Sequence, residues 1–233
     1  MEIQALWYAG LRFLDNVDKE GPWRGLADRV SEAMVRLYPM ESTTGERYLS
    51  DCLHAAPGQG AGRAEPDNAL RPNQLLAVTL GAVRDPALCR SILTACESLL
   101  VPGAIRSLAD QSVSPPLPIH GHGRLLNNPD HPYWGQYRGD EDTRRKPAYH
   151  NGTAWTWIFP SYAEALVATY GKAAQPAALA LLGSSIQAIN QGCATQVPEI
   201  MDGDTPHTLR GCGAQAWGTT ELYRVVAMLA GNH

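Results

Sequence analysis

Apolar residues recur at helix spacing along most of the chain. The first stripe is at one side of a predicted N-terminal helix, with Arg12, Asp15, Asp18 and Lys19 on the other side. It consists of Ile3, Leu6, Gly10, Leu11 and Leu14. Similar stripes predict further helices over about 22–37, 72–82, 86–99, 153–170, 179–189 and 214–230, which makes about seven in all.

Several of these helices have recognisable ends. Asp85 followed by Pro86 is typical of an N-cap residue with proline in the first helical turn. Gly171 and Gly231 are typical stop residues. Alternating Val/Ile/Thr runs of strand type are nearly absent, so we expect an all-α fold and a single domain over residues 1–233.

Three connections are long: residues 40–70, 101–149 and 192–213, all rich in Pro, Gly, His and Asp. Long connections in a compact helical domain usually carry function. We therefore expect them to gather at one end of the helices and build a site there.

Composition narrows the class of ligand. Hydrophobic residues make up 44% and charged residues 18%, as in ordinary globular proteins. A net charge of −4 argues against nucleic acid or an anionic membrane as partner. Five scattered cysteines without a C-x-x-C pair, together with no leader and no apolar run of transmembrane length, predict reduced thiols and a cytoplasmic location.

The aromatic residues indicate the kind of substrate. There are six Trp and nine Tyr but only two Phe. Aromatic side chains with a polar atom suit a site where sugar rings stack and hydroxyl groups need partners, although an accident of composition would give the same counts.

The strongest candidate chemistry lies in residues 197–217. Pro198 places Glu199 on an extended or turning backbone, and Asp202-Gly203-Asp204 is typical of a turn. A lone loop carboxylate is usually only solvated. Here further acids and the side chains of His207, Arg210 and Trp217 are close in sequence, which equally favours a pocket.

Three other stretches are candidates, each with a simpler structural explanation. Tyr149, His150 and Trp155 would line a sugar subsite, or Asn151 or Thr153 would cap a helix whose tryptophans pack in the core. Residues 67–74 put polar groups at a helix start. Glu2 would bind substrate, or simply complement a helix dipole.

No cofactor or metal is expected. His120-x-His122 has no third ligand at useful spacing, and no phosphate-binding glycine loop is present. Ser, His and Asp residues occur without a nucleophile elbow, which argues against acyl transfer.

Taken together, these blocks resemble the C-terminal catalytic domain of prokaryotic-type glycogen debranching enzymes, the amylo-α-1,6-glucosidase family. The matching blocks are EIQALWY (2–8), LRPNQ (70–74), Y-x-G-D-E (137–141), AYHNGTAW (148–155) and PEIMDGDTPHTLRGCGAQAW (198–217).

The resemblance implies an (α/α)6 barrel of six helical hairpins and inverting hydrolysis of α-1,6-linked glucose at a branch point of glycogen or another α-glucan. Inversion needs two carboxyl groups, one as general acid and one as general base. Glu199 matches the family's general base. The residues that match its pocket wall are Glu2, Trp7, Tyr149, His150, Asp202, Arg210, Gln215 and Trp217.

The chain also departs from the family. The family's general acid lies upstream of the EIQALWY block, at which this chain starts. We predict about seven helices, whereas the family's barrel has twelve. Three hypotheses follow: a glycosidase completed by a second copy or by a complementing upstream polypeptide, a remnant that binds α-glucan or maltooligosaccharide without cleaving it, or a structural protein. We expect a homodimer that covers two apolar stripes, Ile3/Leu6/Leu14 and Leu222/Val225/Val226/Leu229.

Overall fold

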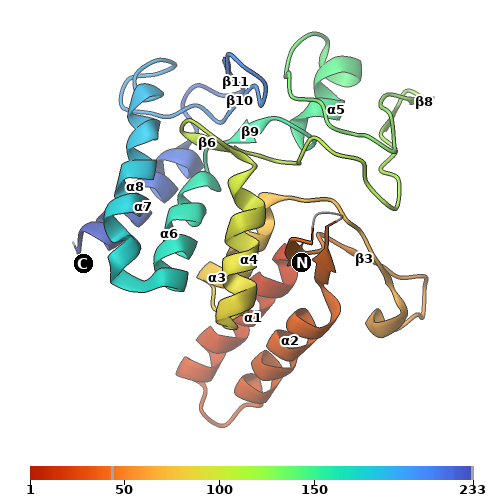
Figure 1. The fold of residues 1–233 in the computed structure, drawn as a ribbon, viewed down its shortest axis with the longest axis vertical. Coiled ribbons are helices and arrows are strands. Elements are labelled where there is room, and N and C mark those ends of the chain that lie inside the picture. The colour runs from red at the N-terminus through yellow and green to blue at the C-terminus, as the bar shows by residue number, and fades with distance from the viewer. Residues whose placement is uncertain (43–44, 232–233) are drawn as a thin grey trace.

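The structure is a computed structural model that describes residues 1–42 and 45–231, and helices dominate it (Figure 1). None of the helices in these two ranges has the length and apolarity that a membrane crossing requires. The α-helices are α1 (Glu2–Val17), α2 (Trp23–Leu37), α3 (Leu75–Thr79), α4 (Pro86–Glu97), α5 (Lys146–Tyr149), α6 (Phe159–Tyr170), α7 (Gln175–Leu182) and α8 (Ala216–Ala230).

The helices form one packed series. α1 packs against α2 and α3, α3 against α4 and α6, and α6 against α7 and α8. Leu11, Met34, Leu75, Ile92 and Phe159 are almost completely buried and come from five of these helices. A single hydrophobic core therefore runs through the series, as the helical stripes predict.

Two predicted helix ends are confirmed. The Asp85 carboxylate accepts a hydrogen bond from the backbone N–H of Leu88 at 2.7 Å, directly before Pro86 in the first turn of α4. At the other end of the chain, Gly231 has the left-handed backbone, with φ of 76°, that ends α8.

The predicted helix over 153–170 is wrong in its first turns, because α6 begins only at Phe159. Thr153 and Thr156 use their hydroxyl groups to bind carbonyl groups of Tyr149 and Pro198, which competes with helix formation. The neighbouring Trp155 pairs in a sheet. Two other helices are shorter than predicted: residues 72–74 and 183–187 are 3₁₀ turns that flank α3 and α7.

The inward face of α1 also differs from the prediction. The buried residues are Ala5, Tyr8, Leu11 and Asp15, whereas Ile3 and Leu6 are 69% and 47% exposed and Leu14 is half-buried. Tyr8 is fixed inward because its hydroxyl accepts a hydrogen bond from Arg84 at 2.9 Å. The helix is apolar on two sides, so periodicity alone could not decide which side faces the core.

The all-α expectation needs a second correction, because short antiparallel strands join the long connections. The five-stranded sheet has the order β11-β10-β9-β6-β5, and three two-stranded ribbons pair β1 with β2, β3 with β4, and β7 with β8. Their bounds are β1 (Pro39–Glu41), β2 (Arg47–Leu49), β3 (Leu53–His54), β4 (Glu65–Pro66), β5 (Leu100–Val101), β6 (Ala104–Arg106), β7 (His120–Gly121), β8 (Arg124–Leu125), β9 (Ala154–Trp155), β10 (Ile200–Met201) and β11 (Leu209–Arg210).

The five-stranded sheet lies beyond one end of α4, α6 and α7 (Figure 1). Trp155 of β9 is its centre, paired with Ile105 on one side and Ile200 on the other. Strands of two or three residues are too short to show alternation in the sequence. The sheet nevertheless brings segments from three parts of the chain to one place.

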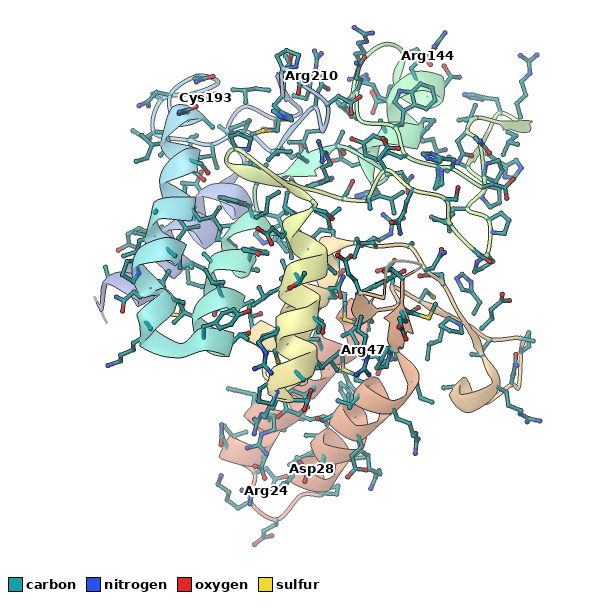
Figure 2. The ribbon with its side chains drawn as sticks, in the orientation of Figure 1. Arg24, Asp28, Arg47, Arg144, Cys193 and Arg210 are labelled. Carbon is teal, nitrogen blue, oxygen red and sulfur yellow. The ribbon has the colours of Figure 1, made fainter. Side chains whose placement is uncertain are left out.

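The cap of α4 gives a test of the fold. Replacing Asp85 by alanine leaves the Leu88 N–H without its partner, so Asp85→Ala should lower the free energy of unfolding by about 1 kcal/mol. Urea denaturation followed by circular dichroism measures this change. Asp28→Ala, at an exposed position on α2 (Figure 2), is the matched control and should change stability by less than about 0.5 kcal/mol. Equal effects of the two substitutions on the free energy of unfolding would show that the Asp85 cap does not stabilise α4.

Candidate active site

A cavity of about 380 Å³ lies where the long connections meet the helices. Its wall contains two carboxylates, Glu2 and Asp51, and the guanidinium group of Arg71. The remaining wall is largely aromatic and consists of His150, Trp155, Trp157 and Trp217, with Pro72, Asn73, Ser107 and Ile158. Aromatic rings beside a few polar groups are the composition expected of a pocket that binds a sugar.

The aromatic wall is built from two stacked pairs. Trp157 stacks on Trp217 with ring centroids 4.0 Å apart and 21° between the ring planes. His150 stacks on Trp155 at 5.2 Å with the planes 5° apart. Trp217 is 50% exposed, so one face of this pair stays open to a ligand. Desolvation and the charge of Arg71 lower the pKa of His150, which favours the neutral imidazole at neutral pH.

Arg71 holds three segments of the site together. Its guanidinium donates hydrogen bonds to the Ser107 carbonyl at 3.0 Å, the Asn151 side chain at 2.9 Å and the His150 carbonyl. Its Nε atom lies 3.2 Å from a carboxylate oxygen of Asp51. Burial lowers the pKa of Arg71, while the neighbouring carboxylates oppose that shift. The cavity wall therefore depends on one buried cation.

Glu199 lies next to this wall and is half-buried. One carboxylate oxygen accepts a hydrogen bond from the Tyr149 hydroxyl at 2.5 Å, and the other accepts one from the backbone N–H of Cys212 at 2.9 Å. Burial and the Glu199 charge both raise the pKa of Tyr149, so this hydroxyl remains a donor. Each Glu199 oxygen keeps a second lone pair, which a water molecule can use.

The link from Glu199 to the cavity is aromatic. Glu199 is not among the residues that line the cavity in the described part of the chain. Its partner Tyr149 has its ring centroid 4.6 Å from that of His150 and 4.9 Å from that of Trp155, and both of these rings do line it. Glu199 is thus separated from the cavity wall by one ring.

The buried Asp202, which follows β10, forms an ion pair with the half-buried Arg210 of β11. Arg210 donates hydrogen bonds to both carboxylate oxygens of Asp202 at 2.9–3.2 Å. The Oδ1 atom of Asp202 also accepts a hydrogen bond from the backbone N–H of Tyr137 at 2.7 Å. Figure 2 shows Arg210 among the loops that surround the sheet. These contacts hold the loop after Glu199 in place.

Two glycines let the sequence blocks approach closely. A Cβ atom added to Gly203 would lie 2.0 Å from the Gly152 carbonyl oxygen, and one added to Gly152 would lie 2.5 Å from the backbone of Trp134. Gly152 also has φ of 148°. The HNGTAW and MDGD segments therefore touch through their backbones, which larger residues would prevent.

Residues 118–224, just under half of the chain, match the model of the amylo-alpha-1,6-glucosidase family. Over these residues the chain is similar to the amylo-alpha-1,6-glucosidase family. A comparison with curated proteins gives no match.

The family segment contains most of the predicted site residues, from Tyr149 to Trp217, whereas Glu2 and Trp7 lie outside it. Glu2 still reaches the cavity and accepts a hydrogen bond from the Asn73 side chain. Trp7, Asp202, Arg210 and Gln215 are absent from the cavity lining within the described residues. Trp7 is half exposed, and Gln215 precedes α8.

Sequence reasoning missed three of the residues that line the cavity. Arg71 lies in the LRPNQ block, but its position gave no sign that it would bind three carbonyl oxygens. Asp51 follows strand β2, and Ser107 follows β6. Neither residue could be assigned to the site from its position, because these strands are too short to be recognised in the sequence.

The Gly152–Gly203 contact of the family segment gives a second test. Gly203→Ala forces the two backbones apart and should lower the free energy of unfolding by about 1–3 kcal/mol. Gly183→Ala is the control, since an added Cβ there meets nothing within 4 Å. Urea denaturation of both variants compares them, and equal stability would show that the two segments do not touch in this way.

Proposed function

We propose that this protein is part of an α/α-barrel glycosidase that removes α-1,6-linked glucose at a branch point of glycogen or a related α-glucan, with inversion. Glu199 is the proposed general base. The observation that carries the proposal is the hydrogen-bonded carboxylate of Glu199 beside an aromatic cavity, within a segment of the amylo-alpha-1,6-glucosidase family.

The chemistry of inversion supports these roles. A general base must hold a water molecule opposite the leaving oxygen, typically about 6.5–9.5 Å from the acid. Tyr149 and Cys212 fix the Glu199 carboxylate by one hydrogen bond on each oxygen and leave lone pairs for water. Trp217 and Trp157 offer a stacked surface for a glucose ring. The family resemblance suggests an α-glucan or maltooligosaccharide as the partner, and this stacked surface supports a sugar ligand.

The fold proposal is an arc of the six-hairpin barrel. α1 contacts α3, α3 contacts α6, and α6 contacts α8, so these four helices form a consecutive row. Residues of all four helices line one groove. In this arrangement the cavity lies at the end of the arc that carries the long connections.

The general acid is the open question between two functions. By the family resemblance it belongs to an upstream segment, in which case the isolated chain should bind maltooligosaccharides weakly and release little glucose. The alternative function is therefore an α-glucan-binding remnant. Two carboxylates, Glu2 and Asp51, do line the cavity and would be the acids nearest a bound sugar if the isolated chain proves active. By contrast, Asp202 is bound to Arg210, and Asp204 accepts a hydrogen bond from Tyr133.

Replacing the proposed base gives the direct test. Glu199→Gln keeps the shape of the side chain but cannot accept a proton, so it should lower glucose release from a limit dextrin by about 10²–10⁴-fold. The assay uses the purified chain, alone and with an added polypeptide that carries the upstream acid-bearing segment of a family member. Nuclear magnetic resonance of the fresh product should show β-glucose, as inversion requires.

The matched control is Glu32→Gln, at an exposed position on α2, which should keep wild-type turnover. Wild-type turnover in Glu199→Gln would remove Glu199 from the mechanism. Oligosaccharide binding by calorimetry with no glucose release under either condition would favour the binding function instead.

We further propose that the chain covers its apolar faces by forming a homodimer. Ile3, Leu6, Phe13 and Val17 lie on one exposed stripe of α1. A groove between α7 and α8 is lined almost wholly by apolar side chains, among them Leu182, Ile186, Leu222, Tyr223 and Val226. Of the residues expected to be left open on α8, Val225 and Leu229 are instead buried within the chain.

Sedimentation at micromolar concentration tests the dimer. Each 100 Å² of apolar surface removed from water contributes about 2.5 kcal/mol, so covering the two apolar faces favours association. Ile3→Asp combined with Phe13→Asp should produce monomers, whereas Arg12→Asp on the neighbouring polar side should not. A wild-type monomer would refute the dimer, and a complex formed only with the upstream polypeptide would show that this partner covers the faces.

A further inference from the structure

The ribbon of β3 and β4 places three metal-binding side chains on one face. His54 pairs with Glu65 and Leu53 with Pro66, which sets Cys52 opposite Asp67 in the same antiparallel register. The backbone N–H of Asp67 donates to the Cys52 carbonyl at 3.1 Å, as this register requires. Cys52 and His54 are two residues apart, so their side chains share a face, and the opposing Asp67 shares it too.

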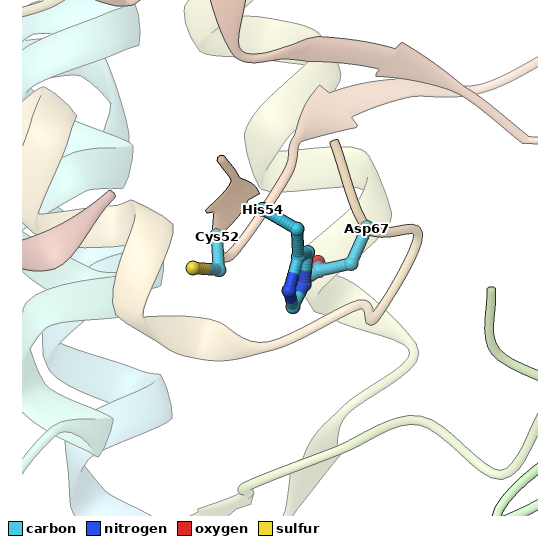
Figure 3. Close-up of side chains that lie close together, drawn as sticks. All are labelled: Cys52, His54 and Asp67. Carbon is cyan, nitrogen blue, oxygen red and sulfur yellow. The ribbon is translucent and has the colours of Figure 1, made fainter. Parts of the chain in front are cut away.

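The side-chain positions agree with the backbone register (Figure 3). One ligand atom from each of the three residues lies within 4.8 Å of the other two. His54 Nε2 is 3.2 Å from one carboxylate oxygen of Asp67. Cys52 and His54 are exposed, while Asp67 is only 2% exposed. An ion can therefore reach the thiol and the imidazole from solvent.

Asp67 is oriented by contacts outside the group of three. Its Oδ1 atom accepts hydrogen bonds from the Asp51 N–H at 3.1 Å and the Ser50 hydroxyl at 3.5 Å. These bonds fix the carboxylate so that Oδ2 faces His54. Metal-binding carboxylates are commonly held by such outer hydrogen bonds.

The charge around Asp67 is also suited to a cation. Asp67 lies beside a second carboxylate, because its Oδ1 atom accepts from the backbone N–H of Asp51, and the nearby guanidinium group of Arg71 faces the Asp51 side chain. Arg71 donates its hydrogen bonds to three acceptors other than Asp67, and its Nε atom faces Asp51. A buried carboxylate needs a compensating positive group, and a cation between His54 and Asp67 would supply it.

We propose that Cys52, His54 and Asp67 form a binding site for a borderline-soft divalent cation, with Zn²⁺ as the best match. Sulfur and imidazole ligands favour zinc over magnesium or calcium, which prefer oxygen alone. Zinc with three protein ligands keeps a fourth position for water, at typical ligand distances of about 2.0–2.3 Å. This proposal does not depend on the glycosidase activity.

Zinc titration of the chelator-treated protein tests the site. With a chromophoric chelator as competitor, the wild-type chain should bind one equivalent of Zn²⁺ with a dissociation constant of about 1 µM or below. Cys52→Ser and His54→Ala should each weaken binding at least about tenfold. Cys193→Ser is the matched control, because Cys193 is an exposed thiol in the connection between α7 and β10 (Figure 2), and this variant should bind zinc as the wild type does.

A second measurement uses only the wild-type chain, so it is independent of how the variants fold. Zn²⁺ should slow alkylation of Cys52 by iodoacetamide, followed by peptide mass spectrometry, and leave Cys193 unaffected. Co²⁺ bound to the wild-type chain should give a thiolate charge-transfer absorption band. Absence of stoichiometric zinc binding, or equal alkylation of both thiols with and without zinc, would overturn the proposal.

Discussion

The buried guanidinium of Arg71 is the interaction on which the site depends. It joins Asp51 from the connection after α2, Ser107 from the connection after α4, the backbone carbonyl of His150 and the side-chain oxygen of Asn151. Removing one partner of a buried charge leaves the other without compensation, which costs more than a surface ion pair contributes. The three segments that carry the cavity wall are thus fixed relative to one another by one residue of the LRPNQ block.

A second constraint on the site is the close contact between two backbone segments. Gly152 and Gly203 touch, and β9 lies between β6 and β10. This sheet places Tyr149 beside Glu199, since Thr156 and Glu199 are themselves joined by a backbone hydrogen bond of 3.3 Å. Cation and glycine contacts therefore perform different tasks. Arg71 positions the residues that line the cavity, and the glycines position the carboxylate beside it.

The sequence predicted the helices better than the site. Long apolar stripes and the Asp85 and Gly231 caps located α2, α4 and α8 closely, because these signals are local. The start of α6 was missed, since Thr153 binds carbonyl groups just before it in the chain and Thr156 binds the distant Pro198 carbonyl, and these contacts override helix propensity there. Likewise, the roles of Arg71 and Asp51 arise from segments far apart in sequence, and no spacing rule connects them. The assignment of Glu199 as general base is a proposal that rests on family resemblance, because the residues alone did not distinguish it from a solvated acid.

Asp67 shows how the ribbon and the cavity are coupled. One of its oxygens accepts from the backbone of Asp51, whose side chain lines the cavity and faces Arg71, while the other oxygen faces His54. A change of charge at His54 or Cys52 therefore acts on the same carboxylate that orients residue 51. Over such short, buried contacts an electrostatic change is weakly screened. A cation on the ribbon would hold Asp67 in place and, through Asp51, also the side of Arg71 that faces the Asp51 carboxylate, so the outer ribbon and the cavity form one connected polar network.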